Sequence, residues 1–509
     1  MAVGWHRAGR VGAATISFHM YDFARVTEFG SRLANSLDFV GAPLRRSAAT
    51  DFSSALGDPS DEASIRAGAP WRTPAIVAAC MLVLAVLGIW MISRAPFWLD
   101  EASAILSARG SLETLDDAYG PNQAFYILVL HFWRLLGESE LRLRLLSVIC
   151  AVATVPTLYL LGHSLLGKRA ALAACLLFAT NAFVVVYAQQ VRPYTLLLLL
   201  LVVGTLLYLQ AMKRSSWTMW TLYGILMVAA IWTNFFAGFV FLAHVVGFLT
   251  RRPRPQILPA VPATALIIAA AVPIGLFVTS TARKYIDGWV APTSPSAVWG
   301  AMTEVAGGGS LRLVLTAALI AVGLVALGLA AKRWSIGLLV AWITFPFVGA
   351  ILISLVAPVF LSRYMLLTAP AIALLAGAGL AKLRPLPAVL VGAAVLLATG
   401  PSLIALYDKP YDDWRGAAAY VATYARAGDR IVFDDPLGEK PFVVYLDRNR
   451  HAPLVTVPAQ EASPASRVWL VFWRHSYNET TAIRNAMGKY KAVVNEGFGF
   501  LHVQLAVPR

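Results

Sequence analysis

The stretch that decides the fold is PAIVAACMLVLAVLGIWMISRAPFWLDEA, residues 74–102. Its first part, residues 74–93, is apolar and contains no charged side chain. About twenty such residues are needed to cross a hydrocarbon core of roughly 30 Å. Two carboxylates, Asp100 and Glu101, follow soon after this run. Because charges near a bilayer are costly to keep, we expect the pair to have a structural or chemical role.

The composition indicates a polytopic membrane protein. Of the 509 residues, 58% are hydrophobic and only 14% are charged, whereas soluble proteins have about 25% charged residues. Apolar runs of near-spanning length recur along most of the chain. The net charge of +15 comes largely from short loops between these runs, so we expect membrane lipids as partners and no nucleic acid.

Basic clusters predict the topology, because cytoplasmic loops are enriched in Lys and Arg. About two apolar runs separate each cluster from the next, so all clusters return to one side: Lys168-Arg169, Lys213-Arg214, Arg251 to Arg254, Lys332-Arg333 and Lys382 to Arg384. The N-terminus is then cytoplasmic and the C-terminus extracytoplasmic. The sequence predicts eleven spans, at residues 74–93, 145–165, 170–187, 193–211, 217–233, 235–250, 257–279, 310–330, 335–356, 364–381 and 385–406.

This predicted topology divides the chain into three domains. Residues 1–73 are mixed and polar, without a cleavable signal peptide, and are expected to form a cytoplasmic, partly disordered extension. Residues 74–406 form the transmembrane domain, with a first external loop at 94–144. Within that loop, residues 123–137 are apolar but too short to span and predict a helix lying in the outer interface.

Residues 407–509 predict a small extracytoplasmic α/β domain. The segment DDWRGAAAYVATYARAGD indicates an amphipathic helix. Five short apolar segments indicate strands, namely RIVFDD, FVVYL, PLVTVP, RVWLVFW and GFLHVQLA. No cysteine follows Tyr407, and Cys80, Cys150 and Cys175 all lie in apolar segments without a Cys/His cluster. We therefore assign no metal ligand and no disulfide; the sequence permits a divalent metal but does not require one.

Polar side chains gather at the outer face in this topology. They are Asp100, Glu101, Asp116, Asp117, Asn122, Arg142 and Arg144 in the first loop, Gln189, Gln190, Arg192 and Tyr194 at the next outward turn, Arg283, Lys284 and Asp287 in a third loop, and Arg363 and Tyr364 at the last turn. Arginines bind phosphate through charge-assisted bonds, and a carboxylate can accept the proton of an attacking hydroxyl. This set fits a lipid-phosphate-linked sugar, with the phosphate as leaving group.

Structural roles compete with this chemistry. Asp100 and Glu101 can cap the helix predicted for the following ASAILSARG segment, since acids favour helix N-termini. Arg142, Arg144, Arg192 and Arg363 can anchor spans to lipid phosphates, and Asp116 can be a solvated loop residue. Between the two carboxylates, we favour Asp100 as the catalytic one, with capping as an additional role.

The chain resembles the GT-C membrane glycosyltransferases of the dolichyl-phosphate-mannose–protein mannosyltransferase type. It is similar to their bacterial branch, which includes lipid A aminoarabinose and galacturonic acid transferases. The resemblance covers roughly residues 75–430 and depends on the order and spacing of five stretches: FWLDEA, FYILVLHFWRLLGESELRLRLLS, VVYAQQVRPYTLLL, FLSRYMLLTAPAIALLAG and DDWRGAAAYV.

The resemblance implies roles for individual residues. Asp100 corresponds to the catalytic base, and Glu101 to the second acid of the pair. Arg144, Arg192 and Arg363 correspond to phosphate-binding or site-shaping arginines. With Tyr364, Asp117, Asn122 and Gln190 they form our candidate donor site. The chain departs from many relatives at GPNQAFY, which replaces a His-Pro-Pro-like motif and leaves a metal or acceptor contact there unassigned.

Two functions remain. The first is transfer of a sugar, with mannose one candidate, from a polyprenyl-phosphate donor to an envelope glycan, lipid or protein. The alternative is a transporter or flippase for lipid-linked sugars. Transporter sites lie near the bilayer midplane between internal repeats, whereas here the charges gather at one face and the halves show no repeat. A third reading, a non-catalytic binder of lipid phosphate, conflicts with the intact acidic pair.

The topology predicts that residues 123–137 are reached from the outside only. A single cysteine placed near Arg134 should react with a membrane-impermeant reagent added outside intact cells. Labelling only from the cytoplasmic side would reverse the predicted orientation of the later spans.

Overall fold

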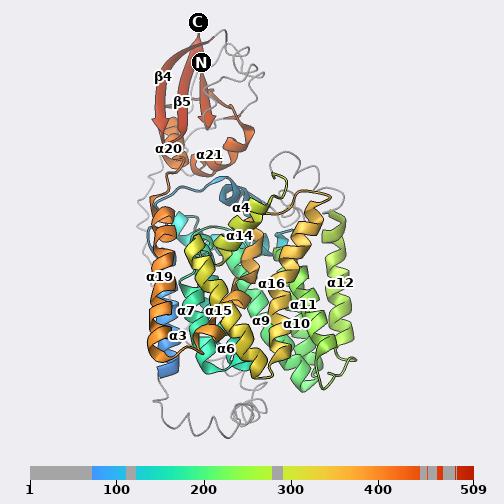
Figure 1. Ribbon diagram of the computed structural model, residues 1–509. Helices are drawn as coiled ribbons and strands as arrows, with labels where there is room; N and C mark the ends of the chain where they lie inside the picture. The colour runs from blue at the N-terminus through green and yellow to red at the C-terminus, as the bar shows by residue number, and fades with distance from the viewer. Residues whose placement is uncertain are drawn as a thin grey trace, which may run out of the picture. The chain divides into compact units, whose positions relative to one another are not determined.

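The protein is described here by a computed structural model, which covers residues 72–110, 122–277, 290–447, 455–456, 467–473, 488 and 490–509. Residues Thr73–Arg509 form one compact unit, with a bundle of apolar helices followed by a domain containing a β-sheet (Figure 1). The expected N-terminal extension, up to residue 71, and the acids Asp116 and Asp117 lie outside the described residues.

Eight helical segments in the described part are long and apolar enough to span a membrane, or nine if a bent pair is one span. They are α3 (Arg72–Ile89), α6 (Glu140–Leu166), α9 (Tyr194–Arg214), α12 (Ala260–Phe277), α15 (Ser310–Leu329), α16 (Arg333–Ser354), Ser362–Leu380 and α19 (Pro385–Asp408). The segment Ser362–Leu380 comprises α17 (Ser362–Met365), η4 (Leu366–Thr368) and α18 (Ala369–Leu380). The bent pair is α7 (Lys168–Ala179) with α8 (Ala182–Ala188).

The predicted class, an α-helical polytopic membrane protein, is therefore confirmed, but the count of eleven spans is not. The two remaining predicted spans correspond to α10 (Trp217–Thr233) and α11 (Ala237–Thr250), with 17 and 14 residues. At 1.5 Å per residue, α10 is at the lower limit of the length needed for a hydrocarbon core of roughly 30 Å, and α11 is below it. Both are predominantly apolar, which is why the sequence pattern resembles that of a full span.

The bend of 59° between α7 and α8 has a specific stabilising contact. Asn181 begins α8 by accepting the backbone N–H groups of Phe183 and Val184 at 2.9 and 3.2 Å. On the other side, the buried guanidinium of Arg312 donates to the carbonyls of Leu177 and Thr180, at 3.0 and 3.2 Å. These carbonyls end α7 and would otherwise have no helical partner. The broken span is thus a defined feature that leads into the turn before α9.

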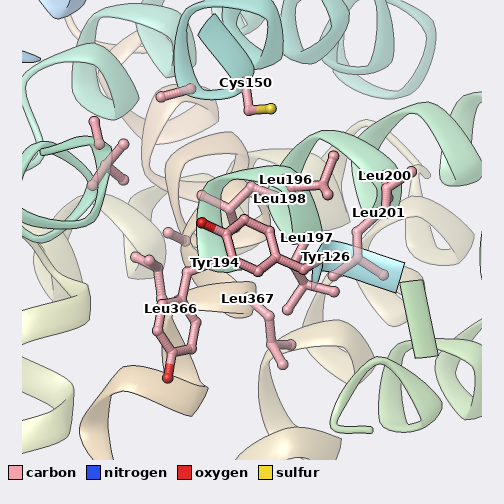
Figure 2. Packing of buried hydrophobic residues seen from close by; sticks show 14 of the residues in the cluster. Tyr126, Cys150, Tyr194, Leu196, Leu197, Leu198, Leu200, Leu201, Leu366 and Leu367 are labelled. Atoms are coloured by element: carbon pink, nitrogen blue, oxygen red, sulfur yellow. The ribbon is translucent and has the colours of Figure 1, made fainter. Parts of the chain in front are cut away.

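Close helix packing depends on small residues in α18, the most buried of the spans. Gly377 lies against the backbone of α7, where an added Cβ would be 2.7 Å from the carbonyl oxygen of Ala170 and 2.6 Å from the nitrogen of Ala174. Small residues allow helices to approach closely in membranes. Elsewhere the core is filled by large side chains: Figure 2 shows Tyr126 and Tyr194 among leucines of α9 and η4, with Leu196 and Leu366 among those labelled.

The C-terminal part contains a five-stranded mixed sheet in the order β2-β1-β3-β5-β4. The strands are β1 (Arg430–Phe433), β2 (Val455–Thr456), β3 (Val468–Trp473), β4 (Tyr490–Phe498) and β5 (Leu501–Pro508). β1 pairs in parallel with β2 and β3, and β5 pairs antiparallel with β3 and β4. Two helices, α20 (Trp414–Tyr424) and α21 (Glu439–Leu446), complete an α/β domain as predicted, with η5 (Pro436–Gly438) before α21.

One predicted strand was wrong. The segment FVVYL lies in α21, which buries Phe442, Val444, Tyr445 and Leu446. A short apolar run can be either a strand or a buried helix, and periodicity alone does not separate the two. Here Glu439 in the first turn favours the helix.

Short helices lie at the end of the bundle next to the C-terminal domain. They are α4 (Leu99–Arg109), α5 (Ala124–Trp133), η2 (Arg134–Leu136) and α14 (Pro295–Val305), of which α4 and α14 are labelled in Figure 1. α5 and η2 together form the helix predicted for residues 123–137, and they are too short to span. α20 and α21 lie between this end of the bundle and the sheet (Figure 1).

Candidate active site

The acidic pair occupies the first turn of α4, where unpaired backbone N–H groups favour negative charge. Successive residues on a helix point about 100° apart, since one turn takes 3.6 residues. The two carboxylates consequently meet different surroundings. Glu101 is fully buried, whereas the Asp100 side chain remains 22% exposed.

Glu101 forms a buried, two-pronged ion pair with Arg144 at the start of α6. Arg144 donates from Nε to Oε1 at 2.8 Å and from Nη2 to Oε2 at 2.7 Å. It also donates to the carbonyls that precede α4: those of Ile92, Ala95 and Pro96 at 2.5, 2.8 and 3.1 Å. These bonds engage all three guanidinium nitrogens, and a guanidinium has five N–H groups to offer. Arg144 thus holds the residues before α4 against the start of α6.

Glu101 also holds the turn between α8 and α9. Its Oε1 accepts the backbone N–H of Val191 at 2.8 Å. The hydroxyl of Ser147, one turn beyond Arg144, donates to the carbonyl of Gln190 at 2.6 Å. One buried carboxylate therefore fixes three segments: the residues before α4, the start of α6, and the turn that carries Arg192.

Asp100 faces two other arginines. Its Oδ2 lies 3.3 Å from Nη2 of Arg192 and 3.0 Å from Nη1 of Arg363. Arg192 also donates to the backbone carbonyl of Asp100 at 3.2 Å. Arg192 lies at the α8–α9 turn and Arg363 in α17, so residues far apart in the chain meet here. One carboxylate between two guanidinium groups leaves a positive charge, which suits a phosphate.

Aromatic rings surround the two arginines. Arg192 lies over the ring of Tyr194 at 5.6 Å, and Arg363 over the ring of Tyr364 at 5.8 Å. Tyr194 also contacts Tyr187, with ring centroids 4.6 Å apart. The hydroxyl of Tyr194 and Oε1 of Gln190 are buried without a hydrogen-bond partner in the structure. Unsatisfied buried polar atoms are costly, and a bound ligand with hydroxyl groups would satisfy them.

The predicted site residues thus separate into groups. Arg192, Arg363 and Tyr364 gather at Asp100, while Arg144 joins Glu101. Asn122 accepts the backbone N–H of Phe235 at 3.2 Å and so links the start of α5 to the segment between α10 and α11. Asp117 lies outside the described residues. Tyr194 was recognised only as a residue of the outward turn, although its place in VRPY next to Arg192 was the available signal.

No group of three or more His, Cys, Asp or Glu side chains suited to a metal ion is found within the described ranges. The residues gathered at Asp100 are one carboxylate, two arginines and tyrosines. This donor set suits an anionic ligand better than a cation, because the arginines repel a metal ion.

The fold is similar to that of solved membrane glycosyltransferases. The crystal structure of ArnT from Cupriavidus metallidurans bound to undecaprenyl phosphate aligns with a TM-score of 0.58 at 13% identity, over 86% of this chain and 98% of that chain. The oligosaccharyltransferase of Archaeoglobus fulgidus in the apo form aligns with a TM-score of 0.53 at 12% identity, over 85% and 74%. The same organism's AglB with an inhibitory peptide and a dolichol-phosphate aligns at 0.50 and 12%, over 83% and 72%.

The apolar helices indicate a multi-pass membrane protein, and its fold is similar to that of the GT-C membrane glycosyltransferases. Residues 121–282 match the model of the dolichyl-phosphate-mannose-protein mannosyltransferase family. The chain therefore combines a fold similar to the GT-C glycosyltransferases with a match to this family model over less than half of its length. No curated protein sequence matches the chain.

The buried pair predicts a marked loss of stability when either partner alone is removed. Glu101→Gln leaves the Arg144 charge buried and uncompensated, which typically costs 3–5 kcal/mol, here taken as about 4 kcal/mol. The variant should unfold at a clearly lower temperature in detergent than the wild type. Glu496→Gln, an exposed acid on β4, is the matched control and should leave the transition unchanged. A Glu101→Gln transition equal to that of the control would contradict the structural role.

Proposed function

We propose that the protein transfers a sugar from a polyprenyl-phosphate donor to an acceptor hydroxyl, with Asp100 as general base. The observation that carries the proposal is the Asp100 carboxylate between Arg192 and Arg363, at 3.3 and 3.0 Å. A base and two phosphate-binding groups thus share one site. The undecaprenyl phosphate bound by ArnT, which has the same fold, supports a lipid-phosphate donor.

The proposed reaction is a single displacement. Asp100 accepts the proton of the acceptor hydroxyl, while the oxygen of that hydroxyl forms a bond to the anomeric carbon of the donor sugar. The bond between that carbon and the phosphate oxygen breaks, and the electron pair leaves with the phosphate. Arg192 and Arg363 stabilise the charge that develops on the phosphate. Because the acceptor attacks opposite the leaving group, the configuration of the anomeric carbon is inverted.

The donor-free arrangement supports a simple order of binding. Both arginines contact Oδ2 of Asp100. A donor phosphate engaging the two guanidinium groups would compete with the carboxylate for them. The Asp100 oxygen then becomes available to the acceptor hydroxyl only after the donor is bound. Gln190 and Tyr194, with their unsatisfied buried oxygens, are the proposed partners of the sugar hydroxyls.

The site also supports the proposed orientation of the chain. Arg144 at the start of α6 contacts α4, so the far end of α6, followed by Lys168 and Arg169, lies at the opposite end of the bundle. A basic cluster at the end opposite the acidic pair is typical of a cytoplasmic surface. We therefore propose a cytoplasmic extension at 1–73, a membrane domain at 74–406 and an extracytoplasmic domain at 407–509. The acceptor is an envelope glycan, lipid or protein on the outer face.

Asp100→Asn should remain folded and lose most of the transfer activity. Asparagine keeps the size of the side chain but cannot take the proton, and a positioned general base contributes about 10²–10⁴-fold. The measurement is sugar transfer by the full-length protein in vesicles, with a panel of polyprenyl-phosphate sugars as donors and thermal unfolding as the folding control.

Two outcomes of this assay would contradict the proposal. Near-normal turnover by Asp100→Asn would exclude this carboxylate as the base. Movement of a lipid-linked sugar across the vesicle membrane by the wild type, without transfer to any acceptor, would instead indicate the transporter or flippase.

Arg363→Ala should reduce kcat/KM for the donor by about ten-fold or more. Charge-assisted bonds contribute roughly 1.5–3 kcal/mol each, and 1.4 kcal/mol corresponds to about ten-fold. Arg363→Lys should recover part of the loss because it keeps the charge but not the planar fork. The control is Arg384→Ala, which changes an exposed arginine just before α19. Equal activities of Arg363→Ala and Arg384→Ala would reduce Arg363 to a membrane anchor.

A further inference from the structure

One tyrosine of the C-terminal domain reaches the loop that carries Asp100. Tyr445, in α21, is 2% exposed. Its hydroxyl accepts the backbone N–H of Phe97 at 2.7 Å and donates to Oε1 of Glu140 at 2.8 Å. Its ring stacks on that of Phe97, with centroids 5.7 Å apart and planes at 23°. A single side chain therefore contacts both the residues before α4 and the start of α6.

The protonation state of Tyr445 suits this bridge. Burial raises the pKa of the Tyr445 hydroxyl above its usual value, and the negative charge of Glu140 raises the pKa further. The hydroxyl therefore stays protonated at neutral pH. It can donate to the Glu140 carboxylate while its oxygen accepts from the backbone, so both of its functions are used at once.

Other contacts hold the two parts together around this bridge. Asp447, just after α21, pairs with Arg109 at the end of α4 at 3.2 Å. Arg415, in α20, lies 3.6 Å from Glu140 and donates to the carbonyls of Ser93 and Arg94 at 3.2 and 3.1 Å. The C-terminal domain thus contacts the segment before α4, the end of α4 and the start of α6.

The bridge is close to the catalytic machinery without being part of it. Phe97 precedes Asp100 by three residues, and the guanidinium of Arg144 lies over the Phe97 ring at 5.1 Å. Tyr445 contacts Phe97, Arg144 contacts both Phe97 and Glu101, and Glu101 adjoins Asp100. A shift of Phe97 would be passed to the first turn of α4, because the backbone between the two is short.

From these contacts we propose that the C-terminal domain positions the Asp100 loop, and that Tyr445 is the positioning residue. This inference rests on the proposed function of Asp100 for its catalytic consequence, but the docking itself does not. The Tyr445 hydroxyl holds the Phe97 amide in place, so that Asp100 stays beside the site formed by Arg192 and Arg363 and can take the acceptor's proton once the donor is bound.

The test is Tyr445→Phe in the full-length protein, which keeps the ring on Phe97 and removes both hydrogen bonds of the hydroxyl. We expect kcat to fall by about ten-fold, since small misplacements of a catalytic group are costly, while KM for the donor stays near the wild-type value. Tyr424→Phe, which changes an exposed tyrosine of α20, should match the wild type.

Hydrogen exchange of the Phe97 amide provides a readout independent of activity. Exchange should be faster in Tyr445→Phe than in the wild type and Tyr424→Phe, because the amide loses its acceptor. Unchanged exchange would overturn the docking, and faster exchange with unchanged kcat would overturn the positioning role. If the wild type transfers no sugar at all, the proposed function fails, and the exchange rates alone still decide whether Tyr445 holds the loop.

Discussion

The ion pair between Glu101 and Arg144 is the constraint on which the active-site end of the molecule depends. Both side chains are almost completely removed from solvent, with 0% and 4% exposure. Removing two charges from water is expensive, and the cost is recovered only when geometry is good and further hydrogen bonds are made. Here the carboxylate receives a third bond from Val191, and the guanidinium donates to three carbonyls. The pair thus links the residues before α4, the start of α6 and the turn between α8 and α9.

The Glu101–Arg144 pair explains why two adjacent carboxylates have different surroundings. Glu101 is occupied on both oxygens by structural donors. Asp100, one residue earlier on the helix, keeps partial exposure and contacts side chains from two distant segments. A rigid neighbour lets Asp100 be held near positively charged groups without itself having to stabilise the loop. We regard this division between a structural acid and a reactive acid as the main design feature of the proposed site.

The sequence was informative where a property is local. Apolar length predicted the membrane class, and the position of Asp100 and Glu101 after the first span predicted a helix that begins there. The sequence was less informative about which distant side chains pair with one another. Arg144 and Arg192 both precede apolar runs, and nothing in their flanking residues shows that the first pairs with Glu101 and the second with Asp100. The contact of Tyr445 with Phe97 joins residues 348 positions apart. The FVVYL segment that contains Tyr445 has the pattern of a strand, so the sequence pattern did not indicate this contact.

Chain order gives these contacts a consequence for biosynthesis. Glu101 can meet Arg144 as soon as the second span is made, since 43 residues separate them. Asp100 obtains Arg192 later, and Arg363 only after most of the membrane domain has been synthesised, 263 residues downstream. Tyr445 emerges last of all. The nascent protein therefore forms the Glu101–Arg144 pair early, whereas Asp100 acquires all its partners only when translation is nearly finished. Truncated chains left in the membrane would contain the buried pair without the full set of Asp100 contacts.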